Sequence, residues 1–300
     1  MMLRWIVNNY LRQAAEEKVR EVVGDAFAKR SQPPAESDVA RTTATPTAPA
    51  EENEIVPCEV VFLFASSLES GGLVDKLKDS GTSRHGHGVE HAGKLDGREV
   101  AIVEAGIGPK AAARATAEAI KFYQPKWVVS AGFAAALHED LRRGHVLMAD
   151  SVASTDGQQL AVGLKLDEKT LSATRGLHVG RLLTVDDVIR RPEQRHSLHE
   201  QHQAIACDME TFAVAKACQD SGTRFLSVRI ISDAVDDELP PEIERLLEQK
   251  SIAGKLGAVA GAVLTRFSAA KDLWRLREDA LKASDRLAKF LDGVMSQLQH

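Results

Sequence analysis

Two short stretches in the second half of the chain decide the fold that we expect, CDMET at residues 207–211 and RIISD at residues 229–233. Between them, small apolar residues recur at helical spacing over residues 213–218, and Gly222 is placed to end that helix. The following FLSVRII, residues 225–231, is typical of a buried strand. The two stretches are therefore expected to flank one helix-plus-strand unit.

This unit is expected to bring acidic side chains to one edge of a sheet. Glu210 starts the helix, and Asp233 follows the carboxyl end of the strand. Open α/β sheets bind their ligands at that edge. A third acid, Glu69, comes soon after an earlier apolar run at residues 60–64. We therefore expect three carboxyl groups to meet around a polar small molecule.

The central region alternates between strand and helix patterns. Apolar runs predict strands at residues 60–64, 99–103, 127–130, 146–152 and 176–180, and helical spacing predicts helices at 68–77, 110–123 and 193–203. The glycine- and histidine-rich residues 81–93 are expected to form a loop. This alternation predicts an α/β layer fold with a mainly parallel sheet.

Composition divides the chain into four segments. Residues 1–30 read as an amphipathic helix that docks on protein or pairs with another chain, with weak contact to a membrane surface as an alternative. Residues 31–54 are rich in Pro, Ser, Thr and Ala and are expected to be a disordered linker. Residues 55–242 form the predicted α/β domain. Residues 243–300 lack strand signals and are expected to be a helical C-terminal extension.

Bulk composition limits the partners and the compartment. The net charge of −5 offers no general attraction for nucleic acid. Three cysteines are too few for a disulfide framework, so we expect them to be reduced. The sequence shows no apolar run of membrane-spanning length and no secretory signal pattern, and a cytoplasmic location is the expectation.

Two motifs suggest cofactors or metals but are better explained otherwise. Gly106, Gly108 and Ala111 approximate a dinucleotide fingerprint, yet the next strand ends in the small residues 130–132 instead of the acid that holds a ribose. A tight turn whose N–H groups line a polar pocket is the plainer account. The histidines between residues 85 and 91 lack cysteine or carboxylate partners at metal-ligand spacing, apart from one glutamate. We expect no cofactor and no metal.

In order and spacing, these elements resemble the nucleoside phosphorylase and nucleosidase superfamily, and most closely its 5'-methylthioadenosine/S-adenosylhomocysteine nucleosidase branch. The resemblance covers about residues 58–240 and is carried by the following stretches: residues 99–108 with their alanine-rich helix, the small residues 130–136, Asp208-Met209-Glu210, and Ile231-Ser232-Asp233. It implies a three-layer αβα fold with a mainly parallel mixed sheet. It also implies cleavage of the N-glycosidic bond of an adenosine-type nucleoside.

The resemblance implies a catalytic role for four residues. Asp233 would share a proton with purine N7, which makes the base a better leaving group. Ser232 and Arg229 would orient Asp233, and Glu69 would bind and activate the attacking water. Such a site stabilises positive charge on the sugar and neutralises negative charge on the departing base.

The resemblance also implies the residues that hold the substrate. Glu210 would bind the ribose 2'- and 3'-hydroxyls, and Met209 would pack against the sugar. The remaining expected substrate-binding residues are Asp208, Gly108, Gly132, Phe133, and Val188 in place of a phenylalanine that stacks on adenine in that branch. Members of this superfamily commonly form dimers, so a homodimer is expected.

Three alternatives stay open at this point. Phosphate in place of water is one alternative co-substrate, although the sequence has no arginine next to residues 66–68 or 132–133 and offers Glu69 for water. The small-residue run and the helical tail also resemble hopanoid-associated members, which act on a lipid-linked adenosyl substrate. Phe133 and the missing stacking aromatic favour a non-catalytic, nucleoside-binding scaffold.

Overall fold

The structure is a computed structural model that describes residues 57–85, 88–163, 174–239 and 267–298, with side chains in the last range from residue 278 onward. The chain divides into two units, Met1–Glu52 and Asn53–His300, and all of the described residues belong to the second. The helix expected at residues 1–30 and the linker expected at 31–54 therefore lie outside the described residues.

The predicted strands and helices of the central region are present, but in the described ranges the strict alternation is not: β2 to β4 follow one another without a helix, as do β5 to β7. The strands are β1 (Val60–Phe64), β2 (Lys78–His85), β3 (Gly88–Leu95), β4 (Arg98–Glu104), β5 (Trp127–Ala136), β6 (Val146–Ser154), β7 (Gln159–Ala161), β8 (Leu177–Thr184), β9 (Ala206–Asp208) and β10 (Arg224–Asp233). The helices are α2 (Ser67–Val74), α3 (Pro109–Tyr123), α5 (Pro192–His202), α6 (Thr211–Ser221) and α9 (Phe267–Gln297).

The described strands form one mixed sheet that closes partly on itself. Its centre is parallel, with β4, β1, β5 and β10 side by side, and β3 and β2 extend one side in antiparallel pairs. On the other side, the sheet continues from β10 through β6 and β8 to β9. Because β9 then pairs with β5, these five strands close into a ring.

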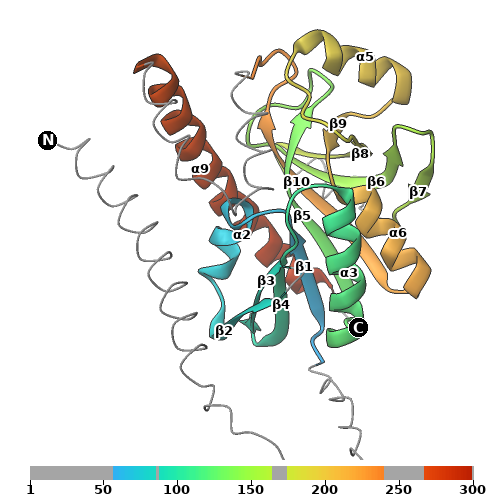
Figure 1. The fold of residues 1–300 in the computed structure, drawn as a ribbon, viewed down its shortest axis with the longest axis vertical. Coiled ribbons are helices and arrows are strands. Elements are labelled where there is room, and N and C mark those ends of the chain that lie inside the picture. The colour runs from blue at the N-terminus through green and yellow to red at the C-terminus, as the bar shows by residue number, and fades with distance from the viewer. Residues whose placement is uncertain (1–56, 86–87, 164–173, 240–266, 299–300) are drawn as a thin grey trace, which may run out of the picture. The chain divides into compact units, whose positions relative to one another are not determined.

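Helices cover both faces of the central strands, which gives the three predicted layers (Figure 1). Successive side chains of a strand point to opposite faces, so β1 divides its apolar residues between two clusters. Val60, Phe62 and Phe64 belong to the larger core, which also contains residues of α2 and α9. Val61 and Leu63 pack with residues of α3 and α6. The predicted α/β fold is confirmed.

Helix α9 contributes its second half to the larger core. Leu287, Leu291 and Met295 are fully buried there. Arg98 donates hydrogen bonds to the carbonyls of Met295 and Leu298, each at 2.7 Å, and so caps the end of the helix. The helical tail expected after residue 242 thus includes a helix that packs into the α/β domain. None of the helices in the described ranges is both long and apolar enough to cross a membrane.

The prediction of a loop over residues 81–93 is wrong. Most of that stretch belongs to β2 and β3, which pair with each other, and β3 also pairs with β4 from Val89 to Leu95. Strand β2 is largely exposed, so it needs no alternation of apolar side chains and carries no sequence signal for a strand. Backbone pairing with neighbours makes this hairpin, despite the low strand propensity of its glycines.

Helices α2 and α9 approach closely at Gly72, and this contact can be tested by mutation. A Cβ atom at Gly72 would lie 2.8 Å from the main-chain oxygen of Ser284. Gly72→Ala should therefore lower the unfolding free energy by about 1–3 kcal/mol, because two packed backbones must separate. Denaturant unfolding measures this change.

The neighbouring Gly71 is a matched control in the same helix. A Cβ there would meet nothing within 4 Å. Gly71→Ala should be neutral or stabilise the protein by up to about 1 kcal/mol, as alanine does in a helix. Equal effects of the two substitutions would contradict the close contact between α2 and α9.

Candidate active site

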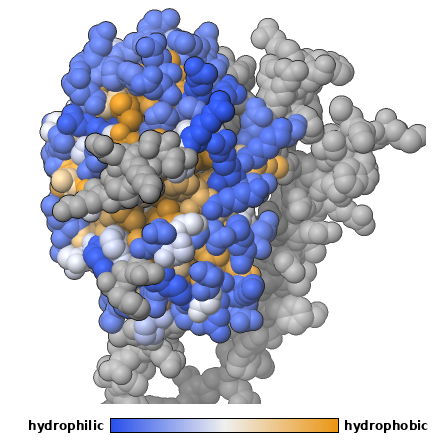
Figure 2. Space-filling model, turned by 180° about the vertical axis from the view of Figure 1, so that it is seen from behind, coloured by the Kyte–Doolittle hydropathy of each residue, from blue (hydrophilic) through white to orange (hydrophobic). Residues whose placement is uncertain are grey.

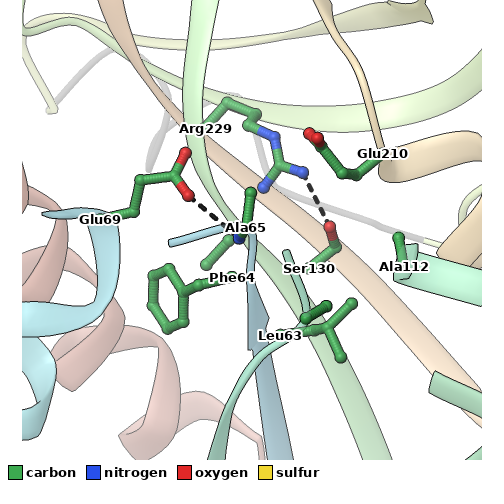
Figure 3. A pocket seen from close by; sticks show the side chains of 10 residues that line it. Leu63, Phe64, Ala65, Glu69, Ala112, Ser130, Glu210 and Arg229 are labelled. Carbon is green, nitrogen blue, oxygen red and sulfur yellow. Dashed lines mark hydrogen bonds between the residues drawn. The ribbon is translucent and has the colours of Figure 1, made fainter. Parts of the chain in front are cut away.

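A narrow hollow lies near the carboxyl ends of β1 and β4, at the predicted edge of the sheet (Figure 3). Three charged side chains reach it, Glu69 from α2, Glu210 from the start of α6, and Arg229 from β10. In Figure 3 the guanidinium of Arg229 lies between the two glutamates. The other lining residues are small or apolar: Leu63, Phe64, Ala65, Ala105, Ala112, Ser130 and Ala131.

Glu69 is held by main-chain N–H groups from two elements. Its Oε2 accepts hydrogen bonds from Ala65 and Ser66, each at 3.0 Å, and its Oε1 accepts one from Phe133 in β5 at 2.9 Å. The Ser-Ser-Leu-Glu sequence at the start of α2 accounts for the first pair, because a glutamate three residues after a serine cap reaches back to the cap. Burial raises the pKa of Glu69, and the Phe133 N–H acts against that rise.

Gly132 makes room for this carboxylate. A Cβ atom at Gly132 would lie 2.7 Å from Oε1 of Glu69, and the φ of Gly132 is +157°. A larger residue would push Glu69 away from β5. The small-residue run at 130–136 therefore has a local reason, and Phe133 serves the site through its backbone while its side chain packs against the larger core.

Glu210 caps the start of α6 and reaches across to the turn before α3. Its Oε1 accepts a hydrogen bond from the N–H of Gly108 at 2.7 Å. Gly108 has a φ of +96°, and Pro109 follows it as the first residue of α3. Burial, followed by the charges of Asp208 and Glu69, raises the pKa of Glu210 to about 8. The predicted position of Glu210 at a helix start and the predicted polar turn at Gly108 are both confirmed.

Arg229 is the centre of a buried polar group that we call the Arg229 cluster, made of Arg229, Asp208, Ser130, Thr211 and Thr184. The guanidinium donates to Asp208 Oδ2 from Nε at 3.0 Å and from Nη2 at 2.7 Å. Nη2 also donates to Ser130 at 2.8 Å and to Thr211 at 2.6 Å, while Thr184 donates to Asp208 Oδ1 at 2.9 Å. The side chains of Arg229 and Asp208 are 3% and 1% exposed.

The cluster corrects two expectations. Arg229 was expected to orient Asp233, but four residues of a strand span roughly 13 Å, and Arg229 bonds Asp208 instead. Asp208 was expected among the substrate-binding residues, yet its carboxylate is enclosed and engaged by Arg229, Thr211 and Thr184. Arg229 therefore lines the hollow, and Asp208 holds Arg229 in place from its far side.

Asp233 lies farther along β10 than the hollow that holds the two glutamates. It is not among the residues that line that hollow. Ser232 donates a hydrogen bond from its Oγ to Asp233 Oδ2 at 2.6 Å, which is the contact expected of Ser232. Met209 is partly buried against a small cluster behind β9, and Val188 is partly buried in the segment between β8 and α5. The expectation that three carboxyl groups meet therefore holds for Glu69 and Glu210 alone, and Asp233 does not line the same hollow.

The sequence-based reasoning missed the polar partners of Arg229. Ser130 ends an otherwise apolar strand pattern and Thr211 opens a helix, so each was visible as a polar residue in an apolar context. Thr184 gave no such signal. Within the described ranges, no group of three or more His, Cys, Asp or Glu side chains is arranged to hold a metal ion.

The mixed sheet, with acidic side chains at the carboxyl ends of its strands, is typical of α/β proteins that bind small molecules at that edge. The model of the phosphorylase superfamily matches residues 59–268, so the chain belongs to the phosphorylase superfamily.

Curated relatives point to one branch. The 5'-methylthioadenosine/S-adenosylhomocysteine nucleosidase of Colwellia psychrerythraea is 28% identical over 237 residues, which is 68% of this chain and 98% of the relative. The enzyme of the same name from Staphylococcus aureus strain Newman is 29% identical over 202 residues, 60% of this chain and 89% of the relative.

Solved structures share the fold. The 5'-methylthioadenosine/S-adenosylhomocysteine nucleosidase of S. pneumoniae with a transition-state inhibitor aligns with a TM-score of 0.61 and 19% identity, covering 80% of this chain and 100% of that one. A futalosine hydrolase mutant of Helicobacter pylori aligns with a TM-score of 0.59 and 18% identity, covering 80% and 100%. Because these two proteins carry different names on one fold, the fold alone leaves the substrate open.

The raised pKa of Glu210 predicts a specific pH dependence of stability. Between an unfolded pKa near 4.5 and a folded pKa of about 8, the folded protein holds a proton that the unfolded chain has lost. The unfolding free energy should therefore fall as pH rises through this window. Glu210→Gln removes the titration, so from about pH 5.5 to 8.5 wild type should lose on the order of 3 kcal/mol more than the variant.

Urea unfolding at several pH values measures this difference. Glu200→Gln, on the exposed face of α5, is a control that should follow the wild-type curve. Parallel curves for wild type and Glu210→Gln would contradict the raised pKa.

Proposed function

We propose that this protein is a purine nucleosidase that cleaves the N-glycosidic bond of an adenosine-type nucleoside of the methylthioadenosine and S-adenosylhomocysteine class, with water as the attacking group. The observation that carries the proposal is the pair of glutamates, Glu69 and Glu210, on opposite sides of one hollow with Arg229 between them. The relatives at 28% and 29% identity, which are named as such nucleosidases, support the same reaction.

The charges around the hollow suit the transition state of this reaction. Breaking the bond between a purine and ribose builds positive charge on the sugar, which a carboxylate stabilises, so Glu210 serves this step in its deprotonated form. Glu210 faces the hollow from the start of α6, where its carboxyl group receives the ribose hydroxyls. Arg229 lines the same hollow, and its positive charge reduces the electrostatic repulsion between the two glutamates.

The position of Glu69 favours water over phosphate. Main-chain N–H groups at the start of a helix readily bind an anion. Here the N–H groups of Ala65, Ser66 and Phe133 all point to the carboxylate of Glu69. A phosphate would meet that negative charge, whereas a water molecule can donate a hydrogen bond to it. The guanidinium of Arg229, the cation that lines the hollow, is already engaged by Asp208, Ser130 and Thr211.

Asp233 is proposed as the acid that assists departure of the base. Oδ2 of Asp233 accepts a hydrogen bond from Ser232, and Oδ1 is then the atom that shares a proton with purine N7. In this proposal the base lies on the Asp233 side of the hollow, beyond the two glutamates. In this arrangement the sugar lies over Arg229 and the base extends toward Asp233 and Val188, with Met209 beside the sugar.

We further propose a homodimer in the cytoplasm, with weak membrane-surface contact through residues 1–30. Figure 2 shows one face of the molecule, where apolar residues lie between hydrophilic ones; among the described residues the one exposed large apolar side chain is Leu281. The three cysteines are free and buried, as suits a reducing compartment.

Adenine release with and without phosphate tests the reaction type. The protein should release adenine from methylthioadenosine or S-adenosylhomocysteine at a rate that inorganic phosphate leaves unchanged at constant ionic strength, because water is the attacking group. Chromatography of the free base measures it. Phosphate-dependent release would establish a phosphorylase, and release only from a long-chain adenosyl substrate would establish the lipid-linked alternative. A complete lack of release from purine nucleosides would leave the non-catalytic scaffold.

Asp233→Asn tests the proposed acid. The amide keeps the shape and can donate a hydrogen bond, but it cannot transfer a proton to purine N7, so kcat should fall by roughly 100- to 10,000-fold. Asp236→Asn, at a position 86% exposed three residues later, is the matched control and should retain wild-type kcat. Unchanged base release in the Asp233 variant would remove Asp233 from the mechanism.

A further inference from the structure

Helix α5 attaches to the protein through a buried cation instead of an apolar stripe. Its sequence, PEQRHSLHEQH, is almost entirely polar, and Arg195 is its one fully buried residue, with 0% exposure. Helices of globular proteins usually dock through apolar residues at helical spacing. Burial of a guanidinium is costly unless its donors are used, so this position is expected to do more than fill space.

The donors of Arg195 go to the main chain of two separate segments. Nε and Nη2 donate to the carbonyl of Ile189 at 3.3 Å and 3.2 Å, and Nη1 donates to the carbonyl of Ala234. Ile189 lies between β8 and α5, and Ala234 follows the last residue of β10. Among the described residues, no carboxylate lies within ion-pair distance of Arg195. Its hydrogen bonds therefore serve to join two loops.

The same two segments meet again a few residues away. The N–H of Leu239 donates to the carbonyl of Arg190 at 3.1 Å, and Nε of Arg190 donates back to the carbonyl of Leu239 at 3.2 Å. The N–H of Ala234 is itself bonded to Asp237, which pairs with Arg143 at 2.7 Å. Both polar groups of the Ala234 backbone are thus fixed, directly after Asp233.

We propose that Arg195 is a positioning residue that sets the spacing of the two segments bounding the purine, by holding the carbonyls of Ile189 and Ala234 from the buried face of α5. Val188 precedes the first carbonyl and Asp233 precedes the second, so this spacing decides how both meet the base. The inference rests on the proposed function, because it takes the base to lie between these two residues.

Arginine is the side chain that fits this task. Its planar guanidinium carries five N–H donors in a fixed fork, so it spans two carbonyls at once. Lysine keeps the charge but concentrates its donors at one point, and methionine fills similar volume with no donor. These differences supply graded variants, Arg195→Lys and Arg195→Met.

A control exists at Arg98, which also donates to two main-chain carbonyls, those of Met295 and Leu298, but caps α9 instead of joining the loops beside Asp233. The assay follows adenine release from methylthioadenosine and inhibition by free adenine, below the melting temperature of each variant. Arg195→Met should lower kcat/KM by roughly 10- to 100-fold and weaken adenine inhibition, because the acid and the base are misaligned. The kcat/KM of Arg195→Lys should lie between those of Arg195→Met and wild type. Arg98→Met should lower the unfolding free energy and leave kcat/KM unchanged.

Hydrogen exchange adds a readout that needs no activity. Arg195→Lys, which keeps a charge in the interior and serves if Arg195→Met does not fold, should speed exchange at residues 186–190 and 234–239, and Arg98→Met should not. Wild-type kinetics in the folded Arg195 variants, or an equal kinetic loss in Arg98→Met, would overturn the positioning role. Failure of wild type to release any base would instead overturn the proposed function, and the exchange data would still decide whether Arg195 joins the two segments.

Discussion

The ion pair between Arg229 and Asp208 is the constraint on which the rest of the site depends. It lies almost completely out of solvent, and with Ser130, Thr211 and Thr184 it joins β10, β9, β5, α6 and β8. A buried pair adds little net stability when intact, but loss of one partner costs on the order of 3–5 kcal/mol because the other charge stays buried. The ring of strands therefore keeps one arrangement around this pair, and Glu69 and Glu210 are placed against a cation whose position is fixed.

Where local chemistry determines structure, the sequence was sufficient. The apolar run of β1 predicts a strand buried on both faces, and Pro109 after two glycines predicts the start of α3. Small apolar residues at helical spacing follow Glu210, so its position at the start of α6 was predictable as well. Each of these features depends on residues within about one turn or one strand of each other.

Contacts between distant residues were not predictable in the same way. The hairpin of β2 and β3 exists because β3 pairs with β4, and its own residues look like a loop. The family resemblance implied that Arg229 orients Asp233, whereas in the structure Arg229 bonds Asp208, 21 residues away in sequence. Arg195 is one of many polar residues of α5, and no residue near it in sequence predicts its hydrogen bonds to the carbonyls of Ile189 and Ala234. Backbone acceptors carry no sequence signature.

The bond between α2 and α9 has a consequence for biosynthesis. Ser284 receives the N–H of Gly72 and donates its hydroxyl to the carbonyl of Glu69, so the helix that carries Glu69 rests on a segment synthesised more than 200 residues later. While the ribosome is still translating α9, the nascent chain can pair its strands but has no support under that helix. The helix that carries Glu69 can therefore take its final position only after the segment that holds it has been synthesised.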